Sequence, residues 1–195
     1  MSLEKIEKKF ESIHQKITTP AFLEMKALGG EVPFFITSYP IEEQNIVYSE
    51  IKRLKKRLYE EGIHVVQINL YDLVIEILQQ RNLLDKLLKK EKELGSERVK
   101  KTLLGVLDIQ KSIIPLIRQK VAEHPEAKIL FLTGIAEVYP YLRSHVILNN
   151  LQSAITHIPT LMFYPGTYTG RSLELFGRFK DDNYYRAFNL DSVEF

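Results

Sequence analysis

Four short apolar runs, separated by longer amphipathic segments, constrain the fold of this chain more than any other feature of its sequence. They are PFFIT at 33–37, HVVQIN at 64–69, AKILFLTG at 127–134 and PTLMFYPG at 159–166. Such runs are typical of strands that are buried on both faces of a parallel sheet. YYRAFNL at 184–190 predicts a further strand at the edge of the sheet. The sequence therefore predicts an α/β fold with a mainly parallel sheet of four to five strands, covered by helices on both faces.

The segments between these runs carry apolar residues at helical spacing. They predict helices over 3–17, 41–61, 71–80, 82–94, 96–107, 110–123 and 135–155, the last with an interruption near His145. A short helix is expected to begin near Pro20 and to end at Gly29-Gly30. We interpret residues 71–124 as a helical insertion within one α/β domain that spans residues 1–195.

Composition excludes several classes of protein and of site. The 27 basic and 25 acidic residues leave a net charge of +2, so any contact with nucleic acid must come from a local cluster. The absence of cysteine excludes disulfides and cysteine-based zinc sites, and the five histidines lack metal-ligand spacing. The sequence has neither a run long enough to span a bilayer nor the apolar core of a signal peptide. We expect a cytoplasmic protein with no membrane association, metal or cofactor.

The stretch YPGTYTGRS is similar to a phosphate-binding loop but departs from it in two ways. Gly166 and Gly170 enclose three residues where that loop has four, and Arg171 stands before Ser172 where the loop has lysine. The shortening changes the curvature that aims successive N–H groups at one phosphate. A tight turn after a strand is the favoured interpretation. Under the alternative of a nucleotide site, these four residues are the candidates for cofactor binding.

Polar residues follow the third predicted strand, where ligands bind in open α/β sheets. The candidates for a polar cluster at the strand ends are Thr133, Glu137, Arg143, His145 and Asn149. A histidine between arginine and asparagine suits acid–base work, but the same residues also suit the capping of a helix junction. We favour capping, and we assign no catalytic residue.

The predicted helix over 41–61 carries the densest basic cluster of the chain. Lys52, Arg53 and Lys56 are the candidates for contact with DNA. Glu50, Glu60 and Glu61 lie close in sequence and reduce the local field, so the wet face of an amphipathic helix is the favoured interpretation.

The C-terminal segment interleaves aromatic and basic residues, a composition typical of protein interfaces. Its candidate interaction surface consists of Tyr168, Arg171, Arg178, Lys180, Tyr184, Tyr185 and Arg186. We expect Phe163, Phe176 and Phe188 to point into the domain instead. Stacking on single-stranded nucleic acid is the alternative, and the near balance of charge in this segment disfavours it.

Four stretches of the chain are distinctive, and they are EVPFFI, INLYDLVIEIL, FLTGIAEVYPYLRSHVILNNLQ and MFYPGTYTGRSLELFGRFKDDNYYRAFNL. Together they resemble the BrxB family. The resemblance implies a component of a BREX bacteriophage-exclusion system that works with a PglZ-like protein of the alkaline-phosphatase type. A BrxC-like ATPase and a PglX-like methyltransferase are the other implied partners. The family offers no established catalytic residues that could be transferred to this sequence.

Three hypotheses for function follow. The favoured one is a non-enzymatic adaptor that binds other BREX proteins through a surface that includes the C-terminal segment, with the helical insertion as a further candidate, and that associates with DNA indirectly. The alternative is a nucleotide- or phosphate-binding sensor or enzyme that uses the carboxyl ends of the strands. A weaker alternative is a subunit that contacts DNA directly through Lys52, Arg53 and Lys56.

Overall fold

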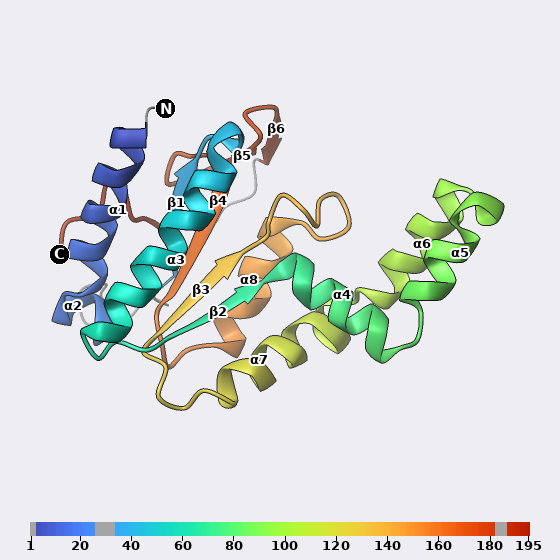
Figure 1. Ribbon diagram of the computed structural model, residues 1–195, viewed down its shortest axis with the longest axis horizontal. Helices are drawn as coiled ribbons and strands as arrows, with labels where there is room; N and C mark the ends of the chain where they lie inside the picture. Colours follow the sequence, from blue (N-terminus) through green and yellow to red (C-terminus); the bar gives the residue numbers. More distant parts are fainter. Residues whose placement is uncertain (1–2, 26–33, 182–186) are drawn as a thin grey trace.

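Parallel strands form the centre of the computed structural model, which describes residues 3–25, 34–181 and 187–195. Within these residues five parallel strands lie side by side in the order β2 (Val65–Asn69), β3 (Ile129–Thr133), β4 (Thr160–Tyr168), β1 (Phe34–Tyr39) and β7 (Phe188–Asn189) (Figure 1). The predicted α/β fold and its mainly parallel sheet are confirmed. β7 is the short edge strand beside β1, whereas residues 184–186 of the predicted edge strand lie outside the described residues.

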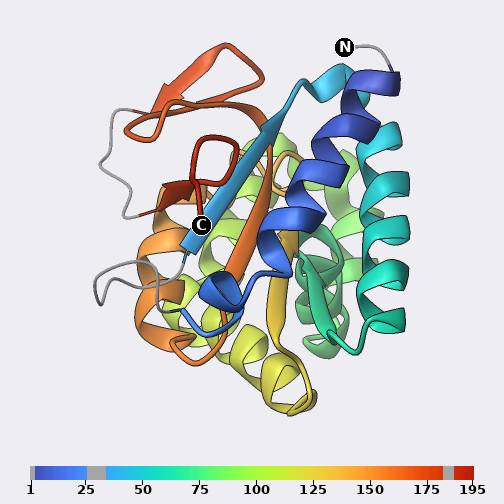
Figure 2. The same cartoon turned by 90° about the vertical axis from the view of Figure 1, so that its left-hand side faces the viewer.

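One face of the sheet, the α3 face, is covered by α1 (Leu3–Ile17), α2 (Pro20–Leu23) and α3 (Gln44–Glu60) (Figure 2). A single 3-10 turn, η1 (Ile41–Glu43), leads from β1 into α3. The rings of Phe131 and Phe163 project from the strands toward these helices. Phe163 stacks on Phe10 of α1 at 6.0 Å and meets Phe131 edge-on at 5.1 Å between ring centres. These aromatic contacts fix how α1 lies on the sheet.

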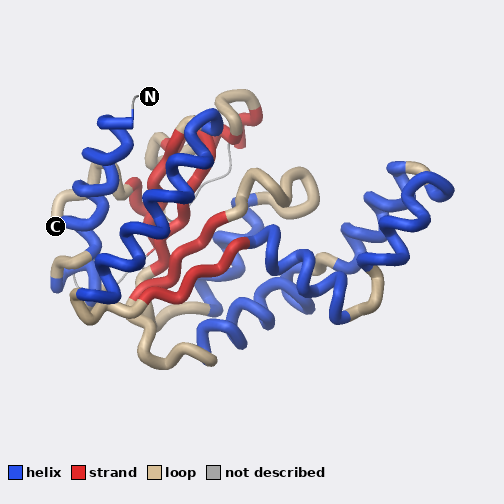
Figure 3. Tube along the Cα trace, viewed as in Figure 1, coloured by secondary structure: helices blue, strands red, loops and turns tan. Residues whose placement is uncertain are grey.

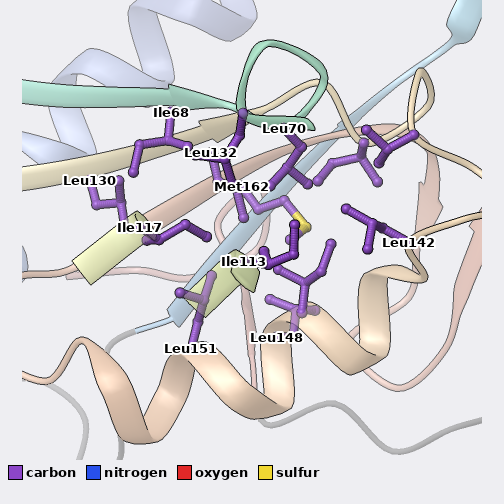
Figure 4. Close-up of a cluster of buried hydrophobic side chains, with 14 of the residues drawn as sticks. Ile68, Leu70, Ile113, Ile117, Leu130, Leu132, Leu142, Leu148, Leu151 and Met162 are labelled. Carbon is purple, nitrogen blue, oxygen red and sulfur yellow. The ribbon is translucent and has the colours of Figure 1, made fainter. Parts of the chain in front are cut away.

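The opposite face, the α7 face, is covered by α4 (Leu70–Gln80), the π-helical turn η2 (Ile109–Ile113), α7 (Ile114–Ala122) and α8 (Ser144–Ala154). Apolar side chains of the strands and these helices meet in one buried cluster. Figure 4 shows Ile68, Leu130, Leu132, Met162, Ile113, Ile117, Leu148 and Leu151 within it. Successive strand residues thus point to opposite faces, and both faces are buried, as the unbroken apolar runs predict.

Two further helices project away from the sheet as a hairpin (Figures 1 and 3). They are α5 (Leu84–Leu94) and α6 (Ser96–Val106), and Gly95 joins them with a positive φ of 72°. Leu87 and Leu103 pack partly against the core, whereas Leu88 and Leu104 are exposed. Of the helical stretch over 71–124, α4 and α7 therefore cover the sheet, and the α5–α6 hairpin extends beyond it.

Two predicted helices are wrong in their extent. Residues 134–143 form turns, so the helix predicted over 135–155 is limited to α8. Ile135, Val138 and Leu142 are buried at helix-like spacing, but Pro140 lacks the N–H that a helix interior needs. The short helix that begins at Pro20 ends at Leu23 instead of Gly29-Gly30, because Met25 adopts a left-handed φ of 56°.

An antiparallel extension of β4 is absent from the sequence-based prediction. β5 (Leu173–Leu175) pairs with the end of β4, and β6 (Phe179–Asp181) pairs with β5. Both strands have three residues, which is too short for an alternation pattern to be recognised in the sequence.

Removing the ring of Phe163 should destabilise the protein strongly. Phe163→Ala leaves a cavity between α1 and β3, and we expect the free energy of unfolding to fall by about 3–5 kcal/mol. Urea denaturation followed by circular dichroism measures this change. Leu3→Ala, at an exposed position of α1, is the control and should cost less than about 0.5 kcal/mol. Equal effects of the two substitutions would contradict the packing described above.

Candidate functional site

A polar pocket of about 310 Å³ lies where α3 passes the carboxyl ends of β2 and β3. We call it the strand-end site. Its lining residues come from three elements and are Tyr48, Ser49, Lys52, Gln67, Asn69 and Thr133. This is the edge of a parallel sheet at which ligands bind in open α/β folds.

The ends of β2 and β3 are held together closely at this site. Asn69 caps α4, because its Oδ1 accepts hydrogen bonds from the N–H groups of Tyr71 (2.8 Å) and Asp72 (3.3 Å). Gln67 Nε2 donates to Thr133 Oγ1 at 3.4 Å. Gly134 follows with a φ of 79°, and a Cβ there would lie 2.4 Å from Asn69 Oδ1. Glycine is therefore required for the two strand ends to approach this closely.

A hydrogen-bonded group of tyrosine and glutamate side chains adjoins the pocket. The Tyr48 hydroxyl donates to the Glu137 carboxylate at 3.1–3.2 Å, and Gln44 Nε2 donates to the same carboxylate at 3.3 Å. Burial, followed by the charge of Glu137, raises the pKa of Tyr48 well above its usual range. The pKa of Tyr39 is raised by burial and by its neighbours Tyr48 and Glu137. Both hydroxyls therefore stay protonated at neutral pH.

The polar residues that the sequence placed in one strand-end cluster lie on different elements of the structure. Thr133 lines the pocket and Glu137 is bonded to Tyr48 on the α3 face. Arg143, His145 and Asn149 lie at and just after the start of α8, which packs on the α7 face. The cause is the turn segment 134–143, which carries the chain to the other side of the sheet before α8 begins.

The glycine-rich stretch forms a β-hairpin turn. Gly166 lies in β4 and pairs with Leu175, and a Cβ at this position would lie 2.1 Å from the carbonyl oxygen of Glu174. In the turn, Thr169 Oγ1 accepts hydrogen bonds from the N–H groups of Arg171 (3.4 Å) and Ser172 (3.1 Å), and Gly170 has a φ of 84°. A strand follows where a phosphate loop has a helix. The N–H groups of Thr169, Arg171 and Ser172 are thus engaged within the turn.

Most bases of α3 are matched by acids. Arg53 pairs with Glu50 at 2.6 Å, and Lys56 lies 3.8 Å from Glu60. Arg57 bridges the helices by pairing with Glu11 of α1 at 2.7 Å. Of the three DNA-contact candidates, Arg53 and Lys56 are paired in this way, whereas Lys52 lines the strand-end site.

The candidate interaction surface of the C-terminal segment is only partly exposed. The prediction that Tyr168 belongs to this surface is wrong. The residue is only 3% exposed, and its hydroxyl donates a hydrogen bond to the Ala187 carbonyl at 2.6 Å. Arg171 and Arg178 are exposed, and Lys180 lies in β6. Tyr184, Tyr185 and Arg186 lie outside the described residues.

A group of one exposed and two half-buried rings, which the sequence did not predict, lies beside Arg178. We call Tyr139, Phe176 and Phe179 the aromatic cluster. Phe179 is 48% exposed and lies 5.2 Å from the ring of Tyr139 and 6.2 Å from that of Phe176. Phe176 and Phe179 flank a turn with positive φ at Phe176 and Gly177, whereas Tyr139 comes from a loop far away in sequence. The pairing of that loop with the hairpin carries no short-range sequence signal.

The described residues, 3–25, 34–181 and 187–195, contain neither a metal-binding group of side chains nor a membrane-spanning helix. Within them no three His, Asp or Glu side chains are grouped so that they could hold a metal ion. None of the helices in these ranges combines the length and the apolar composition needed to cross a membrane.

Comparison with known proteins gives consistent results over nearly the whole chain. The family model described as BREX protein BrxB matches residues 66–190. A BREX protein BrxB of Bacillus cereus (strain H3081.97) is 37% identical over 190 residues, which cover 96% of this chain and 98% of that protein. A BREX protein BrxB of Escherichia coli O9:H4 (strain HS) is 33% identical over 185 residues, covering 95% and 91%. No solved structure gives a significant match.

The two tyrosines beside Glu137, of which Tyr39 is buried and Tyr48 half-buried, should reduce the stability of the fold at alkaline pH. In the unfolded chain their hydroxyls ionise at about pH 10, whereas burial keeps them protonated in the fold. Above this pH the unfolded state binds fewer protons than the folded state, so the free energy of unfolding falls as pH rises. Tyr39→Phe removes one such group. Urea denaturation between roughly pH 9 and pH 11 should therefore show a shallower loss of stability than in the wild type.

Tyr71→Phe is the matched control for this experiment, because Tyr71 is 47% exposed. It should keep the pH dependence of the wild type. A Tyr39→Phe variant whose stability falls as steeply as that of the wild type would show that Tyr39 ionises normally in the fold.

Proposed function

The chain belongs to the BrxB family of BREX proteins, and we propose that it is a non-enzymatic adaptor of a phage-defence complex. In this role it binds a PglZ-like protein and brings it to other members of the system, among which a BrxC-like ATPase and a PglX-like methyltransferase are the expected partners. The assembly works in the cytoplasm, and its association with DNA is made by those partners.

The proposal rests on the exposed ring of Phe179 in the aromatic cluster. Phe179 presents about half of its surface to solvent, while Tyr139 and Phe176 pack against its ring and hold it in place. Aromatic side chains and arginine dominate binding energy at protein interfaces, and Arg178 lies beside the cluster. A ring that is already held loses little conformational entropy when it is bound.

The strand-end site supports a structural role for its polar residues. The side chains of Asn69, Thr133 and Glu137 are engaged in hydrogen bonds that join β2, β3, α3 and α4. Arg143 and His145, which acid–base chemistry would need beside them, lie at the start of α8, a helix whose buried side chains pack on the other face. An adaptor, unlike an enzyme, does not need these polar side chains to meet at one point.

Direct DNA contact through α3 is disfavoured by the ion pairs along that helix. Arg53 and Arg57 are paired with glutamates at 2.6–2.7 Å, so a phosphate would have to displace a carboxylate in each case. Affinity for DNA rises with the number of phosphates that unpaired bases neutralise.

Co-purification of the tagged full-length chain with its PglZ-like partner tests the adaptor proposal. Phe179→Ala removes the exposed ring of the aromatic cluster, and Arg178→Glu reverses the charge beside it. We expect each substitution to weaken binding by at least about tenfold, which corresponds to about 1.4 kcal/mol, as measured by calorimetry on the purified pair.

Tyr71→Ala is the matched control, since Tyr71 is exposed to 47% and Phe179 to 48%. It should leave the affinity unchanged. Wild-type affinity in the folded Phe179 and Arg178 variants would remove the aromatic cluster from the interface. Failure of the intact wild-type chain to bind the PglZ-like protein would refute that partner.

A further inference from the structure

The basic residues of α3 differ in whether they form ion pairs. Arg53, Lys56 and Arg57 are paired with glutamates. Lys52 and Lys55, by contrast, form no ion pair or hydrogen bond within the part of the chain that the structure describes. Within residues 3–25, 34–181 and 187–195, no carboxylate therefore pairs with either ammonium group.

The surroundings of these two lysines suit an anionic partner. Lys52 lines the strand-end site, and Lys55 is half-buried beside it on the helix. Burial lowers the pKa of Lys55, because the ammonium has lost water without gaining a carboxylate. A carboxylate supplied by another molecule would remove this cost.

Tyr48, Lys52, Lys55 and Tyr59 follow one another at spacings of four, three and four, so they lie along one side of α3. We call these residues the basic strip. At one end Tyr48 shares the strand-end site with Asn69, and at the other the ring of Tyr59 meets His64 edge-on at 5.2 Å. The basic strip thus runs alongside the whole of β2, antiparallel to it.

β2 is itself an open edge of the sheet. It pairs with β3, and within the described residues no strand pairs with its other side. The His64 carbonyl accepts a hydrogen bond from the N–H of Lys128, at the start of β3. Since backbone groups alternate along a strand, Val66 and Ile68 also face β3, whereas the N–H and C=O groups of Val65 and Gln67 point away from it.

We propose that β2 accepts an extended acidic segment of a partner protein as an additional strand. The backbone of the segment pairs with Val65 and Gln67, and carboxylates on alternate residues contact Lys52 and Lys55. Main-chain pairing supplies affinity in this mode of recognition, and side chains supply specificity. Nucleic acid has no peptide backbone that could pair with the N–H and C=O groups of an open strand edge. This favours a polypeptide as the occupant.

This surface goes beyond the adaptor proposal, because it contains no residue of the aromatic cluster. The two proposals can therefore fail separately. A second attachment point would let the chain hold two segments at once, which raises the effective concentration of each for its site.

A labelled peptide of about ten residues with alternating glutamate and valine serves as the probe. It is titrated into the full-length protein at roughly 50 mM salt, and fluorescence anisotropy follows binding. We expect binding together with slower hydrogen exchange at the amides of Val65 and Gln67. Lys52→Ala/Lys55→Met removes both charges but keeps an apolar stem at the half-buried position, and should weaken binding by at least about tenfold.

Gln67→Pro provides a second variant that tests the strand edge itself. Proline removes an N–H that points away from β3, so the backbone ladder with β3 is kept and the added strand loses a hydrogen bond, while the fold loses only the side-chain bond from Gln67 to Thr133. Lys100→Ala/Lys101→Met on α6 is the control, because it removes the same charge at exposed positions elsewhere. Phe179→Ala should also bind the peptide normally.

Three outcomes overturn the proposal. Peptide binding that survives both the Lys52/Lys55 double variant and Gln67→Pro would place the peptide elsewhere. Unchanged hydrogen exchange in β2 on saturation would exclude strand addition. Absence of peptide binding, with binding of a short duplex DNA that the double variant loses, would assign the basic strip to nucleic acid.

Discussion

The burial of β3 and β4 on both faces is the constraint on which the rest of this structure depends. Leu130, Leu132 and Met162 face one layer of helices, and Phe131 and Phe163 face the other. Each fully buried side chain of this kind contributes about 1.5–3 kcal/mol, so neither face can be left open to water. The chain must therefore cross over the sheet between strands, and these crossovers bring α3 to the carboxyl ends of β2 and β3.

This constraint explains which parts of the fold are predictable from sequence. Unbroken apolar runs and helical periodicity identify the central strands and their covering helices, because burial acts on the same residues that carry the pattern. Apolar periodicity gives the wrong prediction for segment 134–143. Ile135, Val138 and Leu142 are buried at helix-like spacing, but the segment is not helical. Burial there comes from turns packed over the strand ends, with Pro140 the local sign that a helix cannot continue.

The polar sites were harder to predict, because they depend on how distant elements meet. Thr133 and Glu137 follow from the position of a strand end, but their partners on α3, Tyr48 and Lys52, follow from how that helix packs on the sheet. Tyr168 was predicted to lie on the surface, and this prediction is wrong. A tyrosine in a polar, aromatic segment suggests the surface, yet its ring is buried because its hydroxyl reaches the Ala187 carbonyl.

The net charge of the chain does not reveal the local positive charge of Lys52 and Lys55 along β2. With 27 basic and 25 acidic residues the whole chain is nearly neutral. The acids are not evenly distributed, however: glutamates of α1 and α3 pair with Arg53, Lys56 and Arg57, whereas Lys52 and Lys55 along β2 have no acidic partner among the described residues. A partner responds to the field within about 10 Å of its contact and not to the total charge. The unmatched lysines beside an open strand edge are therefore a local signal for an acidic polypeptide in a protein without a general attraction to anions.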